Sequence, residues 1–72
     1  EIDFLKEQFL AALSAESAGY VERADALRAF ARWMGFARTG PKIAEIGATL
    51  IRRLIRAGRL TAQGSQIKRS PA

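Results

Sequence analysis

The residues with the clearest chemical character recur along positions 41–57. Six polar residues there would fall within about 100° of arc on a helix: Lys42, Glu45, Thr49, Arg52, Arg53 and Arg56. The opposite face would carry Ile43, Ile46, Gly47, Leu50, Ile51 and Leu54. The basic members of the polar face can hold phosphate groups, and the early positions could reach base edges, since lysine donates to guanine and glutamate accepts from cytosine.

Four more bases flank this segment. Arg38 precedes it, where the free N–H groups at a helix start favour an anion, and Arg59, Lys68 and Arg69 follow it. If about six to eight of these bases touch phosphates, affinity for a nucleic acid should fall steeply with salt. The alternative is a solvated surface, because the dipole of a helix favours cations near its C-terminal end. That alternative does not account for the bases outside the helix, which we expect to cluster around it.

Charge is sorted along the chain. The formal net charge is +5, from 12 basic and 7 acidic residues. Residues 1–22 hold one lysine and five carboxylates, a net charge of −4, whereas residues 23–72 hold eleven bases and two carboxylates, a net charge of +9. An arginine-rich source organism would raise the total but would not sort it. The asymmetry therefore indicates a polyanionic partner for the C-terminal part.

The composition excludes several other kinds of site. The 72 residues contain no cysteine and no histidine, which removes disulfides, thiolate ligands, the commonest metal ligand and the commonest general base. We therefore expect no cofactor, no metal and no enzymatic activity. No apolar run approaches the roughly 20 residues that span a bilayer, and no secretory signal is apparent. The chain begins at Glu1 rather than Met, so we expect one domain, residues 1–72, cut from a longer protein.

The apolar pattern predicts two helices ahead of the basic one. Ile2, Leu5, Phe9 and Leu13 recur at helical spacing and predict a helix from Asp3 to about Ala15, capped by Gly19 in the left-handed conformation. Tyr20-Val21 would form a very short strand. Leu27, Phe30, Ala31 and Met34 predict a second helix from about Ala24 to Met34. Trp33 lies off that stripe and would either pack at the edge of the core or be exposed for contact.

The remaining elements follow from glycine and proline. Gly35 and Gly40 bound a turn, and Pro41 suits the first position of a third helix that runs to about Ala57. Gly47 on its apolar face indicates that another helix crosses close by. Leu60, Ala62 and Ile67 would share one face of a hairpin with Gly64-Ser65 at its tip, a type II′ turn in which Gln63 faces Gln66.

The predicted order is helix, short extended piece, helix, turn, helix, hairpin. We therefore expect a mainly α fold with a small β-hairpin, a winged helix-turn-helix of three helices plus a C-terminal wing. In such a fold the third helix enters the DNA major groove, and the wing reaches the backbone or the minor groove. The predicted partner is duplex DNA, contacted mainly through phosphates.

One stretch resembles a known family. Residues 33–40, Trp-Met-Gly-Phe-Ala-Arg-Thr-Gly, then Ile43 and Gly58-Arg59-Leu60, resemble the small winged-helix domain found toward the C-terminal end of bacterial superfamily-one helicase-like and endonuclease-linked proteins. The match covers about residues 19–68, but Lys68 and Arg69 replace the large apolar residues expected on the returning strand. The resemblance implies a cytoplasmic bacterial accessory domain that binds DNA or docks onto neighbouring domains, without catalysis.

Two other functions remain open. A protein-docking module of a larger helicase- or nuclease-like assembly would use the acidic first helix, or an apolar patch formed by Trp33 and Phe4. An RNA-binding domain is less favoured, because no sheet with stacking aromatic residues is predicted.

Overall fold

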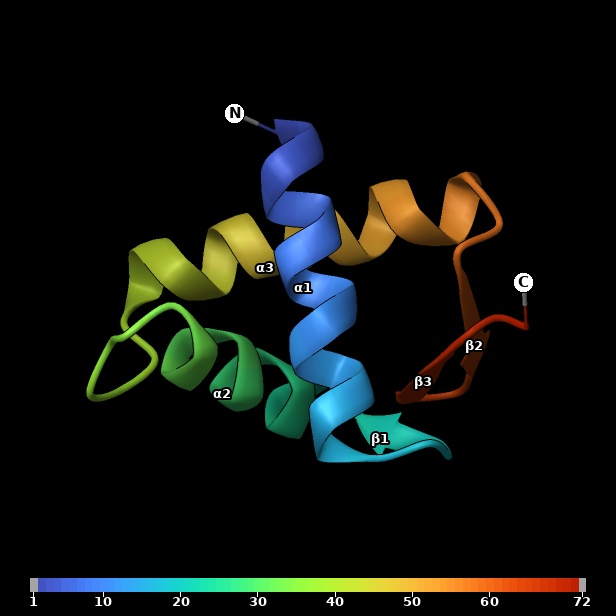
Figure 1. Ribbon diagram of the computed structural model, residues 1–72, viewed down its shortest axis with the longest axis horizontal. Helices are drawn as coiled ribbons and strands as arrows, with labels where there is room; N and C mark the ends of the chain where they lie inside the picture. The colour runs from blue at the N-terminus through green and yellow to red at the C-terminus, as the bar shows by residue number, and fades with distance from the viewer. Residues whose placement is uncertain (1, 72) are drawn as a thin grey trace.

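Three helices and three short strands make up the chain (Figure 1). The computed structural model describes residues 2–71. The elements are α1 (Ile2–Glu16), β1 (Val21–Glu22), α2 (Arg23–Trp33), α3 (Pro41–Arg56), β2 (Leu60–Gln63) and β3 (Gln66–Arg69). The order is the expected one, and the fold is mainly helical with a small antiparallel sheet. None of the helices in this range combines the length and apolar character needed to cross a membrane.

The sheet has three strands rather than the two of an isolated hairpin. β3 is central, with β1 and β2 antiparallel on either side, and Val21 pairs with Ile67. Gln63 pairs with Gln66, as predicted. Gly64 has a φ of 60°, and no non-glycine residue described has a positive φ. These angles agree with a type II′ turn, in which only the first central residue needs a positive φ.

The ends of two elements differ from the predictions. Gly19 has no positive φ, so it does not cap α1 in the left-handed conformation; its N–H donates to Ser17 Oγ at 3.0 Å. Ala62 is exposed although Leu60 and Ile67 on the same face are buried. Ala62 belongs to β2, which is an edge strand of the sheet, with β3 on one side only.

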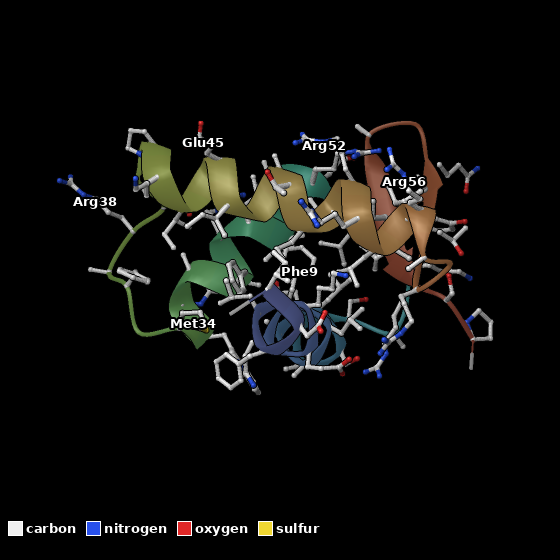
Figure 2. The ribbon with its side chains drawn as sticks, turned by 90° about the horizontal axis from the view of Figure 1, so that it is seen from above. Phe9, Met34, Arg38, Glu45, Arg52 and Arg56 are labelled. Carbon is white, nitrogen blue, oxygen red and sulfur yellow. The ribbon has the colours of Figure 1, made fainter. Side chains whose placement is uncertain are left out.

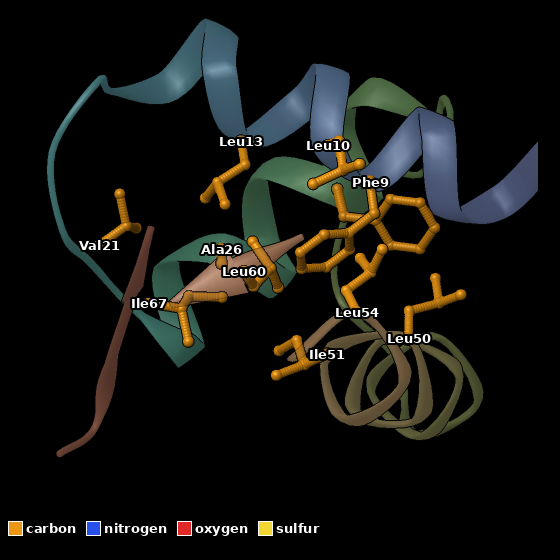
Figure 3. Close-up of a cluster of buried hydrophobic side chains, with 11 residues drawn as sticks. Phe9, Leu10, Leu13, Val21, Ala26, Leu50, Ile51, Leu54, Leu60 and Ile67 are labelled. Atoms are coloured by element: carbon orange, nitrogen blue, oxygen red, sulfur yellow. The ribbon is translucent and has the colours of Figure 1, made fainter. Parts of the chain in front are cut away.

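The core lies where the three helices meet the hairpin (Figure 3). α1 contributes Phe9, Leu10 and Leu13, and the Phe9 ring lies 5.3 Å from that of Phe30 on α2. Leu10 is buried in addition to the predicted stripe, whereas Ile2 in the first turn of α1 is exposed. α3 and the hairpin complete the cluster with Leu50, Ile51, Leu54, Leu60 and Ile67. Among the residues described, every buried side chain is apolar.

Candidate nucleic-acid interface

α3 is divided as its sequence predicts. Its buried residues are Gly47, Leu50, Ile51 and Leu54, whereas its exposed or partly exposed polar residues are Lys42, Glu45, Thr49, Arg52, Arg53 and Arg56. Glu45 and Arg52 project away from the side on which Phe9 and α1 lie (Figure 2). Packing the apolar face on α1 and α2 therefore turns the polar face to solvent.

The two ends of α3 are set by backbone geometry. Gly40 is the N-cap in an extended conformation, and Pro41 follows at the first helical position. Proline has no backbone N–H, and none is needed at that position. At the other end, the Arg59 N–H donates to Leu54 O at 2.8 Å and the Gly58 N–H to Ile55 O at 3.0 Å. This is a Schellman motif, and Gly58 supplies its left-handed residue with a φ of 78°. The chain thereby turns directly from α3 into the hairpin.

The bases of α3 and of the preceding turn have no carboxylate partner among the described residues. Within residues 2–71, no ion pair or side-chain hydrogen bond involves Arg38, Lys42, Arg53 or Arg56. Arg52 donates to the Thr49 hydroxyl at 3.2 Å. Glu45 is also unpaired in the part of the chain described. This face thus presents uncompensated positive charge with one carboxylate in its middle.

A groove of about 500 Å³ runs along the C-terminal half of α3. Its lining comprises Thr49, Arg52, Arg53, Arg56, Ala57 and Lys6. Lys6 belongs to α1 and was not among the predicted site residues. Two features of the sequence could have drawn attention to Lys6. It is the sole base of residues 1–22, and it lies off the apolar stripe of its helix. Neither feature indicates which helix it lies against.

Each of the three hairpin bases contacts a side chain outside α3. Arg59 donates to both carboxylate oxygens of Glu7, at 3.2 and 3.4 Å. Arg69 donates to Ser14 Oγ at 3.0 Å. The Lys68 ammonium lies 5.0 Å from the centre of the Tyr20 ring, a cation–π contact. α1 packs against the hairpin, so its polar side chains take up two of these bases.

The tip of the hairpin, Gly64-Ser65, is hydrogen-bonded to neighbouring elements and contains no basic residue. The backbone oxygen of Ser65 accepts the Arg23 N–H at 3.0 Å, and Ser65 Oγ donates to Glu22 at 2.8 Å. The tip therefore lies against β1 and the start of α2. Lys68 and Arg69 lie toward the open end of the hairpin, near the C-terminal residues.

Arg38 lies in the exposed turn ahead of α3, as predicted, and marks one end of the polar face, with Arg56 near the other (Figure 2). A hollow of about 360 Å³ beside it is lined by Phe36, Thr39, Arg28 and Arg32 in addition to Arg38. Arg28 and Arg32 differ from Arg38 because they pair with Asp25 and Glu16 respectively. Their charges are compensated by these carboxylates, whereas Arg38 has no ion pair with any residue of the described range.

Trp33 is partly packed at the edge of the core and partly exposed, so it combines the two alternatives that the sequence left open. Its side chain is 48% exposed, yet the indole Nε1–H donates to Gln8 Oε1 on α1 at 2.8 Å. It therefore bridges α1 and α2 at the edge of the core while one part of the ring meets solvent. Phe4 is 56% exposed.

Among the residues described, no group of three or more acidic side chains is placed to hold a metal ion. Histidine and cysteine are absent from the sequence. The chemistry of the exposed face is that of fixed cations and one carboxylate.

Comparison with family models, with curated proteins and with solved structures gave no match for this chain. The resemblance to helicase-associated winged-helix domains therefore stays a prediction.

Proposed function

We propose that this chain is a winged-helix module that binds duplex DNA through the exposed face of α3. The observation that carries the proposal is the distribution of unpaired charge along that helix. Arg38 and Lys42 lie at its start, Arg52, Arg53 and Arg56 lie in its second half, and Glu45 and Thr49 lie between them.

The spacing of these charges suits a helix lying across the major groove. At 1.5 Å per residue, Lys42 and Arg53 are separated by about 16 Å along the helix axis. The major groove is about 12 Å wide, so cations at the two ends would meet the phosphates on its two sides. Glu45 and Thr49 would then face the base edges, where a carboxylate can accept from cytosine.

Most of the contacts in this arrangement are to phosphates. Within residues 2–71, five bases (Arg38, Lys42, Arg52, Arg53 and Arg56) have no carboxylate partner, whereas the hairpin bases contact α1 or Tyr20. Five phosphate contacts imply a slope of about −4.5 for log K against log salt. We infer weak, sequence-tolerant binding that assists a larger machine, such as the helicase- or nuclease-like proteins that the sequence resembles.

Titration of a labelled duplex with the protein, read by fluorescence anisotropy, tests the proposal. We expect a dissociation constant of about 1–100 μM near physiological salt and a steep loss of affinity between about 50 and 200 mM. A labelled single strand of the same sequence is the comparison, and the duplex should bind more tightly. No binding near 50 mM salt would remove the nucleic-acid function.

The exposed aromatic residues favour protein docking as a second candidate. Phe4 and Phe36 are each about half exposed, and Trp33 is nearly so. Aromatic side chains are enriched at protein interfaces. Phe4→Ser separates the two functions, since it should leave DNA binding unchanged and weaken only an association with another protein domain.

A further inference from the structure

The groove beside the C-terminal half of α3 brings a base of α1 among the arginines of α3. Lys6 lines it together with Arg52, Arg53 and Arg56. Lys6 is the only base in the first 22 residues, which otherwise carry five carboxylates. Its side chain is only 24% exposed, so most of the side chain is packed against the rest of the protein.

The other charged residues of α1 are arranged differently. Glu7 pairs with Arg59, and Glu16 pairs with Arg32. Both contacts set an acid of α1 against a base from another element. Lys6 instead lies on the side of the α3 arginines, where like charges repel. Its ion pair with Asp3 is long, at 3.7 Å, and the Asp3 side chain is 81% exposed, so that pair contributes little to stability.

The dipole of α3 does not explain this concentration of charge. It favours Arg53 and Arg56 in the last turn, but it gives no reason for a lysine on α1 to join them. A carboxylate at position 6 would be the more stabilising residue in a groove that three arginines also line. Local choices that oppose stability are expected at functional sites.

We propose that this groove holds a phosphate group of the nucleic-acid backbone and that Lys6 is one of its contacts. The inference rests on the proposed function and extends the interface from α3 to α1. The phosphate would lie between Lys6 on one side and Arg53 and Arg56 on the other, with Arg52 and the Thr49 hydroxyl at the rim. The N-terminal helix is then part of the binding surface as well as a cover for the core.

The first test is Lys6→Met, which keeps the apolar stem and removes the charge. Arg28→Met is the matched control, because it removes one positive charge from a residue outside the groove that is paired with Asp25. For Lys6→Met we expect about tenfold weaker duplex binding near 50 mM salt and a salt slope that is shallower by about 0.9. Arg28→Met should retain the wild-type slope. An unchanged slope for Lys6→Met, with wild-type DNA binding intact, overturns the inference and leaves the proposed function standing.

Thermal unfolding separates binding from a structural role. If Lys6 faces like charges in the free protein, Lys6→Met should melt at the wild-type temperature or a few degrees above it in low salt. The gain should vanish in high salt, where surface charges are screened. A lower melting temperature in low salt that recovers in high salt would assign Lys6 to its pair with Asp3 and overturn the inference.

The third experiment titrates the protein with inorganic pyrophosphate and monitors binding by the amide chemical shifts in NMR spectra. Pyrophosphate should shift the resonances of Lys6 and of residues 49–57, and Lys6→Met should weaken that binding. This arm does not depend on DNA. If the wild-type protein fails to bind duplex, the proposed function fails, and the pyrophosphate shifts still decide whether the groove holds a phosphate. Shifts spread evenly over all bases would overturn the site.

Discussion

A Cβ atom added to Gly47 would lie 2.2 Å from Leu27 Cδ2. Gly47 belongs to α3 and Leu27 to α2, so the glycine marks where the side chains of one helix press on the backbone of the other. The contact sets the spacing between α2 and α3, the helix that carries the basic face. It is also the reason that a residue with poor helix propensity stands in the middle of α3.

Substitution at Gly47 should depend on side-chain size. For Gly47→Ala we expect a change within about 1 kcal/mol, because the Leu27 methyl can rotate away and alanine is the better helix former by about that amount. Gly47→Val should lower the free energy of unfolding by about 1–3 kcal/mol through overpacking. Urea denaturation measures both variants. Equal stability of the valine and alanine proteins would show that the helices can separate without cost.

Arg52→Ala with Arg56→Ala should weaken binding to all duplexes alike. Both side chains are exposed on α3, and neither pairs with a carboxylate of the residues that the structure describes. Loss of two phosphate contacts should make the salt slope shallower by about 2. Arg28→Ala with Arg32→Ala removes the same charge from carboxylate-paired residues and serves as the control. Equal slopes for the two double variants would place the contact surface elsewhere than on α3.

Glu45→Ala should change affinity and discrimination in opposite directions. The carboxylate lies on the basic face without a partner in the described chain, so removing it reduces repulsion from phosphates and should tighten binding to most duplexes. If Glu45 accepts from cytosine, discrimination among duplexes should fall by about 1 kcal/mol, roughly fivefold. A competition series over duplexes of varied sequence measures both quantities. Tighter binding with unaltered ranking would mean that Glu45 reads no base.

Glu7→Gln should release Arg59 from α1. The pair is bidentate, at 3.2 and 3.4 Å, with both side chains about half exposed. We expect a loss of stability of about 0.5 kcal/mol at low salt, because exposed ion pairs are well screened. A freed Arg59 could add one phosphate contact and steepen the salt slope by up to about 0.9. Denaturation and anisotropy titration measure the two effects. A slope identical to wild type would show that Arg59 stays clear of DNA even when unpaired.

Local pattern was sufficient for the order of elements and for the division of α3. These features follow from signals that span only a few residues: the helical spacing of apolar residues, Pro41, and the glycine near each turn. The pairing of Gln63 with Gln66 follows from a two-residue turn that begins with glycine. The same kind of reasoning placed Arg38 just before the third helix, where the structure has it.

The partners of the charged residues depend on how the elements pack. Three polar residues of α1 have different surroundings. Lys6 lines the groove beside the C-terminal half of α3, Glu7 pairs with Arg59, and Ser14 accepts from Arg69. No spacing along the chain predicts these contacts, because they depend on the angle and rotation at which α1 crosses α3 and the hairpin. That angle is decided by burial of Phe9, Leu10 and Leu13 in the shared core. The sequence thus determined that the C-terminal part is basic and has an exposed helix face, whereas only the tertiary structure decided which bases are neutralised and which remain open to a phosphate.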